Sequence, residues 1–360
     1  MEAPTEDFMV SYEQLAELEK DFDDIDAEMI RIQTTKQAPL YHKRQALIAK
    51  IQNFWPLVFE QAPPDVDQFI QPSDSALLAN SLKQVDVSRF EIEPHSKSAG
   101  GDPRSVAIRL EFGPNDHFED EVLEKHFWFR RAHDGWTGLV SEPVKIQWKK
   151  GKDLTDGLTD LVVEAWTAEK RSEQVANGTA SKGISKRLDL PEHKAIIKKL
   201  ETASEGSQSF FAWFAFRGRH ISSEESVAAT KAEAERREKV KTGDKTDRKA
   251  EDDESEDEDA PEMELEIFPA GDDLAVAISE DLFPGALKYF SQWFTFPVQP
   301  HQRHADPPIA QAQEDEAVSD ADFEDSDEDP EKMVDIRELV KGRKPDREGE
   351  QEGASKKRKT

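Results

Sequence analysis

The chain has 360 residues, of which 36% are hydrophobic and 35% are charged, and its formal net charge is -29. This length suits one large or two modest domains, but a chain this polar cannot bury all of its residues in a core. The negative charge favours basic partners over nucleic-acid phosphates and anionic membranes, and the absence of cysteine excludes disulfide bonds, zinc-thiolate sites and cysteine nucleophiles.

The charge is concentrated outside the predicted folded part. Residues 251–268 hold eleven acids and no Lys or Arg, and residues 301–360 hold eighteen acids against eleven bases. Like charges repel and cannot be buried, so we predict a disordered acidic tail at residues 298–360 with a basic C-terminus, and a disordered N-terminus at residues 1–10. The start of the chain lacks the features of a signal peptide and no apolar run approaches a membrane span, so we expect a soluble intracellular protein without a membrane partner.

The first periodic segment predicts a long helix at residues 11–62. Its apolar residues recur at steps of three and four, at Tyr12, Leu15, Leu18, Phe22, Ile25, Met29 and Ile32. Charged residues fill the positions between them, and such a narrow apolar seam favours pairing with the same helix of a second copy. The alternative is a surface helix packed lengthwise on its own domain.

Pro39 complicates this helix. An interior proline removes a backbone hydrogen bond and crowds the preceding turn, so we expect the helix to kink or break at Pro39 and to restart at Tyr41. The second half presents a wider and more aromatic face, with Phe54, Trp55 and Phe59. The first half would then form the dimer, and the second half would anchor the body.

Four segments with alternating apolar and polar residues follow, and they predict an antiparallel sheet covered by helices. They lie at residues 85–92, 104–112, 122–130 and 144–148. Asp134-Gly135 marks a turn after the third strand.

Helical patterns account for the remaining ordered segments. A short helix is predicted at residues 75–82, with Asp74 or Ser75 as its candidate cap. Further helices are predicted at residues 158–167, 191–200, 222–249 and 271–293, and the last of these is interrupted at Pro284-Gly285. The aromatic residues 209–216 are expected in the core. The predicted fold is therefore α+β, with the body at residues 63–221 and 267–297 and a charged insertion with an acidic run at residues 222–266.

Four blocks of sequence resemble one known family. They are YHKRQALIAKIQNFW at residues 41–55, QWKKGKDLT at 147–155, SFFAWF at 209–214 and ISEDLFP at 278–284. Together and in this order, they are similar to nucleosome assembly proteins, particularly the SET (template-activating factor) branch. The resemblance implies a homodimer through the long helix, an α+β body called the earmuff domain, and histone-chaperone activity in chromatin. The chain departs from that pattern by being longer at residues 158–190 and 222–266.

Within this resemblance, the acids become candidate contacts for core histones, because a diffuse acidic surface attracts a basic ligand at long range and can surrender it to DNA. The ordered candidates are Glu119, Asp120, Glu121 and Glu124 beside the third strand, and Asp272, Asp273, Glu280 and Asp281 around the last helix. The candidates in the acidic runs are Asp252, Asp253, Glu254, Glu256, Asp257, Glu258, Asp259, Glu324, Asp325, Asp327, Glu328 and Asp329. For any single acid, the simpler interpretation is a solvated surface charge.

The C-terminal cluster Lys356, Lys357, Arg358 and Lys359 suits nuclear import, so we expect a nuclear protein that exchanges with the cytoplasm. Alternatively, this basic end folds back on the acidic run.

The histidines show no metal-ligand spacing, and no catalytic constellation is evident, so we expect neither an enzyme nor a cofactor or metal. The resemblance to the SET branch also implies a second hypothesis, a nuclear scaffold or regulator that inhibits a phosphatase or assists a histone acetyltransferase.

Overall fold

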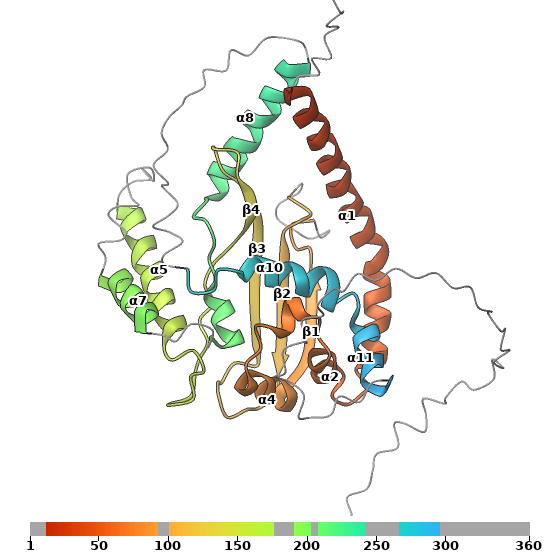
Figure 1. Ribbon diagram of the computed structural model, residues 1–360, viewed down its shortest axis with the longest axis vertical. Coiled ribbons are helices and arrows are strands. Elements are labelled where there is room, and N and C mark those ends of the chain that lie inside the picture. Colours follow the sequence, from red (N-terminus) through yellow and green to blue (C-terminus); the bar gives the residue numbers. More distant parts are fainter. Residues whose placement is uncertain (1–11, 93–100, 176–190, 203–207, 242–265, 296–360) are drawn as a thin grey trace, which may run out of the picture. The chain divides into compact units, whose positions relative to one another are not determined.

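The computed structural model describes residues 12–92, 101–175, 191–202, 208–241 and 266–295 (Figure 1). The predictions of disorder for the N-terminus and the tail, and the acidic run of the insertion, lie outside these residues. None of the helices in the described ranges has both the length and the apolar character that crossing a bilayer would need.

The long N-terminal helix, α1, extends without interruption from Tyr12 to Ile48 with Pro39 inside it, so the predicted break at Pro39 is wrong. Pro39 and Thr35 are both exposed, so the Thr35 carbonyl, which loses its intrahelical partner, can bond to water instead. The interruption comes later, at Asn53, whose φ of 58° turns the chain into a separate helix α2, Phe54–Glu60. The single helix predicted for residues 11–62 is therefore two helices.

The sheet has four antiparallel strands in the order β1-β2-β3-β4 (Figure 1). Their bounds are β1 Leu82–Ser88, β2 Val106–Phe112, β3 Val122–Arg131 and β4 Thr137–Ser141. The antiparallel arrangement is confirmed, but the fourth strand does not lie at residues 144–148. It follows directly from the turn containing Gly135, whose φ is +92°, with Arg131 paired to Thr137.

The alternation of apolar and polar residues at 144–148 reflects which side chains are buried, and it does not mark a strand of the sheet. Ile146 is buried while Lys145 and Gln147 are exposed, as predicted for a strand. However, only Trp148 makes a bridge, to Phe118, and that bridge is isolated. The segment is thus an extended chain that packs on the body outside the ladder.

Helical elements pack around the sheet, and η2 and α10 lie over one of its faces. Their bounds are α3 Pro64–Asp67, α4 Pro72–Ser81, α5 Leu158–Val175, α7 Pro191–Thr202, η2 Phe210–Ala215, α8 Ser223–Lys241, α10 Gly271–Val276, the π-helix η3 Ala277–Leu282 and α11 Ala286–Thr295. Phe127 of β3 stacks on Trp213 of η2 at a centroid distance of 5.3 Å, and the Trp213 indole donates to the Gly271 carbonyl at 2.7 Å. The layers are therefore sheet, η2 and α10. All six residues of η2 are buried, which confirms the prediction that this aromatic segment lies in the core.

Two buried charges tie these layers together. Asp74 accepts hydrogen bonds from the Gln71 and Phe210 amides at 3.0 and 2.7 Å and from the Ser209 hydroxyl at 2.6 Å, so it lies inside the first turn of α4 and fastens it to η2. On β3, the Lys125 ammonium donates to the carbonyls of Glu142, Phe214 and Phe216 at 2.8 to 3.0 Å. Complete burial lowers the pKa of Lys125 to about 7.

A third buried charge fastens the α5–α7 pair to the body. Glu169 of α5 is bonded by His193 of α7 at 2.7 Å and by both terminal nitrogens of Arg217 at 2.9 and 2.7 Å. Burial opposes the charged carboxylate, but these hydrogen bonds outweigh burial and lower the pKa of Glu169 to about 2. The helices predicted at residues 158–167 and 191–200 are both present, and α5 is longer than expected.

Candidate functional site

The apolar seam of α1 is open to solvent. Of the residues predicted to form it, six have exposed fractions of 52% to 61%, namely Leu15, Leu18, Phe22, Ile25, Met29 and Ile32. Tyr12 begins the helix, and its side chain lies outside the described part. Large apolar side chains aligned over several turns and left half exposed mark an interaction surface. These exposures contradict the alternative in which the seam packs lengthwise on its own domain.

The second exposed surface is the sheet face turned away from the helices, which we call the outer face. Asp86, Arg109 and Glu124 face one another across β1, β2 and β3. Arg109 lies 3.6 Å from Asp86 and also bonds Glu111. Glu124 lies 3.4 Å from His126, and its side chain is 42% exposed. The outer face therefore carries acids that are only partly neutralised.

An aromatic patch lies next to these acids. Phe90, His126 and Trp128 pack together with ring centroids 4.8 to 5.9 Å apart, and all three are half-buried. Arg130, 3.5 Å from Glu91, borders the patch. Sequence reasoning missed this patch. The available signal was that both His126 and Trp128 occupy polar-face positions of β3.

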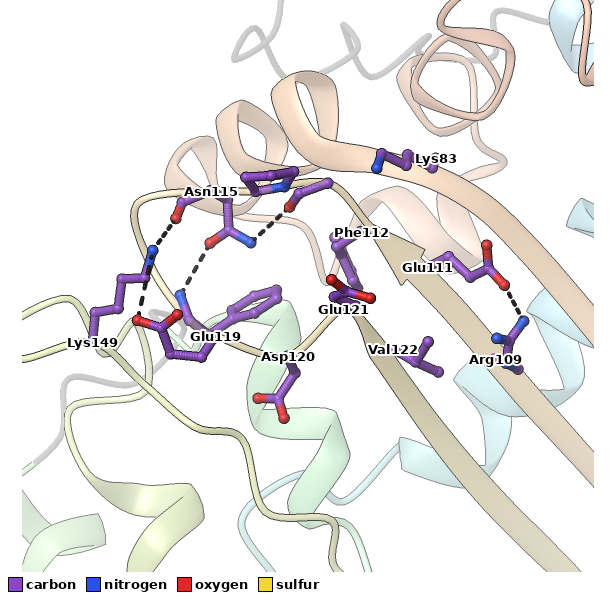
Figure 2. Close-up of a pocket in the computed structure, with 13 residues that line it drawn as sticks. Lys83, Arg109, Glu111, Phe112, Asn115, Glu119, Asp120, Glu121, Val122 and Lys149 are labelled. Atoms are coloured by element: carbon purple, nitrogen blue, oxygen red, sulfur yellow. Dashed lines mark hydrogen bonds and ion pairs between the residues drawn. The ribbon is translucent and has the colours of Figure 1, made fainter.

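Three of the predicted acids, Glu119, Asp120 and Glu121, line a hollow of about 440 Å³ (Figure 2). Figure 2 shows Glu119 facing Lys149, with 3.8 Å between their charged atoms. Asp120 accepts from the backbone and side-chain nitrogens of Gln147 at 2.7 and 3.1 Å. Lysine and arginine side chains line the same hollow, so its charge is mixed rather than purely acidic.

The predicted acids of α10 and η3 lie away from the hollow, and those of η3 have bonding partners of their own. Glu280 pairs with Arg89 at 3.0 Å, and Asp281 accepts from the Tyr289 hydroxyl at 2.7 Å. Asp272 and Asp273 lie in the first turn of α10, where carboxylates stabilise a helix, and burial raises the pKa of Asp272. Several predicted contact acids thus also have structural partners.

The remaining predicted residues lie outside the described part of the chain. These are the acids of residues 252–259 and 324–329 and the basic cluster of residues 356–359. Within the described ranges, no group of three or more potential metal ligands comes together.

Comparison with known proteins decides the family. The profile described as Nucleosome assembly protein (NAP) matches residues 9–292, well over half of the chain. The chain belongs to the nucleosome assembly protein family. The resemblance predicted from the four sequence blocks is therefore confirmed.

Several relatives illustrate this membership. A putative nucleosome assembly protein of Schizosaccharomyces pombe is 34% identical over 154 residues, which cover 40% of this chain and 59% of that protein, less than two thirds of its length. Vacuolar protein sorting-associated protein 75 (Vps75) of Saccharomyces cerevisiae is 24% identical over 281 residues, covering 77% and 76%. Protein SET of Drosophila melanogaster is 32% identical over 120 residues, covering 32% and 40%. The crystal structure of Vps75 aligns with a TM-score of 0.47 at 23% identity, over 78% of this chain and 97% of that one.

Proposed function

We propose that this nucleosome assembly protein is a dimeric histone chaperone that takes part in nucleosome assembly and disassembly. The observation that carries the proposal is the family match over residues 9–292. Among the relatives, the Schizosaccharomyces pombe protein is a putative nucleosome assembly protein, and Vps75 is a histone chaperone. The α1 seam and the outer face supply the two kinds of surface that this activity requires.

Dimerisation rests on the α1 seam. The 37 residues of α1, at about 1.5 Å each, form a rod of about 55 Å. A second copy presents the same seam, so pairing two rods buries the half-exposed side chains of both protomers against one another. Burial of apolar surface is the main favourable term in such an association.

Histone binding is proposed for the outer face together with the acidic runs. Core histones are strongly basic, and the exposed Glu124 and Glu121 attract them without enclosing them. The adjacent rings of Phe90 and Trp128 offer a face on which a lysine or arginine side chain can stack. Residues 252–259 and 324–329 would add long-range attraction and raise the association rate. Because few of these contacts are fixed, DNA with its denser charge can take the histone away.

The direct test is a titration of the full chain with each purified core-histone pair at about 0.15 M and at about 0.5 M salt. We expect a complex that weakens strongly as the salt concentration rises. Absence of a complex at the lower salt concentration would refute the proposal. A pull-down from nuclear extract that enriches a phosphatase or an acetyltransferase instead of histones would favour the regulator hypothesis.

The outer face is tested by combining Glu124→Gln with Trp128→Ala. A cation stacked on an aromatic ring contributes about 0.5 to 2 kcal/mol, so we expect about tenfold weaker histone binding. Glu164→Gln, on an exposed site of α5, is the control for loss of one acid and should bind as the wild type does. Equal affinity of the double variant and the control would remove the outer face from the proposed site.

We also propose that residues 356–359 direct nuclear import. Deleting residues 341–360 should leave a fluorescently tagged protein in the cytoplasm, and undiminished nuclear accumulation would contradict this role.

A second deletion tests the acidic runs in the histone titration. A chain that lacks residues 251–259 and 301–360 should associate with histones more slowly, with a smaller effect on the dissociation rate, because long-range charge acts mainly on the encounter.

A further inference from the structure

The described part of the charged insertion includes the helix α8, which the proposed function does not use. It is 19 residues long, about 28 Å. It has no apolar face with which to pack, and Val227 is 68% exposed. Its contacts are instead polar, and they lie near its two ends.

The first end of α8 is fastened to the turn between β3 and β4. The Arg131 amide donates to the Ser226 hydroxyl at 3.0 Å, and His133 lies 3.6 Å from Glu225. Just before the helix, Arg219 pairs with Asp134 at 2.7 Å and lies over the ring of Trp136 at 5.3 Å. The start of α8 is therefore fixed to the sheet.

The other end of α8 is fastened to the first half of α1, as can be followed in Figure 1. Arg237 donates through three different nitrogens to three carboxylates, at 3.2 Å to Glu17, 2.8 Å to Asp21 and 2.8 Å to Asp24. The pairing is reciprocal, because Lys20 of α1 bonds Glu233 of α8. Hydrogen bonding from Arg236 and Lys20 lowers the pKa of Glu233 to about 2, so these charges persist at neutral pH.

The contacts lie beside the α1 seam and leave it uncovered. Glu17, Asp21 and Asp24 each precede a seam residue by one position, which places them about 100° around the helix from the seam. The seam side chains remain 52% to 61% exposed with α8 in place. A protomer can thus keep α8 docked on α1 while a second copy pairs with the seam.

We propose that α8 is an ion-pair strut that fixes the direction of the first half of α1 relative to the sheet within one protomer. Without it, α1 would be held to the body mainly through its second half, where Arg44 donates to the Phe283 carbonyl at 2.6 Å and Tyr41 packs on Phe283 at 5.0 Å. In the dimer proposed above, two such struts would set the direction in which each sheet projects from the paired rods. Because polar contacts at both ends carry it, the strut loosens as salt screens the charges.

The absence of cysteine in this chain allows a direct distance measurement. Spin labels at Asp23→Cys on α1 and Ala228→Cys on α8 occupy exposed positions outside the contacts described. Labelled full-length protein is diluted into excess unlabelled protein, so that pulsed dipolar spectroscopy reports the distance within one protomer. We expect a narrow distribution at about 0.05 M salt and a broad one after Arg237→Glu. Lys231→Glu makes the same charge change at a site of α8 that is turned to solvent, and should keep the narrow distribution.

A charge exchange distinguishes the ion pairs from general damage to the helix. Asp21→Arg and Asp24→Arg combined with Arg237→Glu should restore most of the narrow distribution. Equal widths for the wild type and Arg237→Glu, or equal broadening by Lys231→Glu, would overturn the strut. The measurement is independent of the proposed function, because the distance within a protomer is defined whether or not the chain dimerises or binds histones.

Discussion

Replacing Leu18, Ile25 and Ile32 together with Asp is expected to make the protein monomeric. These side chains are 52%, 57% and 52% exposed in one protomer, so about half of each is left to bury on pairing. Full burial of a large apolar side chain is worth about 1.5 to 3 kcal/mol, which gives about 1 kcal/mol for each half and about 6 kcal/mol for the two protomers. That loss weakens association by about four orders of magnitude, before the cost of placing carboxylates in the seam.

Sedimentation equilibrium and light scattering over a range of concentrations measure the mass of this variant. Far-ultraviolet circular dichroism of the monomer checks that α1 remains folded, since Asp is a poorer helix former than Leu. The matched control, Leu18→Met with Ile25→Leu and Ile32→Leu, keeps the seam apolar and should remain dimeric. A triple-Asp variant with the mass of the wild type would refute pairing through the α1 seam.

Two further predictions concern buried charges and are measured by chemical denaturation at several pH values. Because burial lowers the pKa of Lys125 to about 7, the unfolded chain binds a proton between about pH 7 and 10 that the folded protein has released. The free energy of unfolding should therefore rise with pH over this range, by up to about 1.4 kcal/mol per pH unit, and Lys125→Met should remove this rise. Lys145→Met, at an exposed position, is the control for loss of one lysine. For Glu169, burial opposes the charge but its hydrogen bonds lower the pKa to about 2, so its contribution is complete above pH 4.5 and is lost as the pH falls towards 2. Glu169→Gln should therefore remove about 3 kcal/mol of the acid dependence. An unchanged pH slope in either variant would contradict the corresponding pKa.

The helices were predictable where the pattern is local. Steps of three and four identify the α1 seam because helical periodicity depends on nearby residues alone. The place where α1 ends was not predictable in this way. A proline at an exposed position leaves only one carbonyl to the solvent, whereas Phe54 and Trp55 are buried among distant residues, and their packing accompanies the turn at Asn53.

The sheet shows the same limit. Alternation predicted that Ile146 is buried between exposed neighbours, which is correct, but it could not show which backbone groups pair. The turn at Gly135 places Thr137 beside Arg131, so residues 137–141 pair with the edge of β3 before residues 144–148 can reach it. The burial of Ile146 is readable from its own segment, whereas strand order depends on which segment reaches the edge of the sheet.

The sequence predicted that the candidate site is acidic, but it did not predict how the acidic side chains are placed or what they bond. The composition showed many acids, but only the structure shows that Asp281 bonds Tyr289 and that Asp120 bonds Gln147. The aromatic patch was missed for the same reason, since Phe90 and Trp128 are far apart in the sequence.

The division of charge along the chain suggests why an ordered outer face and acidic runs would act together. Most acids of the body have a cationic or hydrogen-bonding partner, such as Glu280 with Arg89, so the body alone presents a modest field. The excess negative charge comes largely from residues 251–268 and 301–360. A long-range field raises the encounter rate with a basic ligand but holds it in no fixed orientation, whereas a stacked ring beside an acid holds a side chain at short range. Under the proposed histone-binding role, loss of the acidic runs would slow capture, and loss of the outer face would leave the bound histone without a fixed orientation.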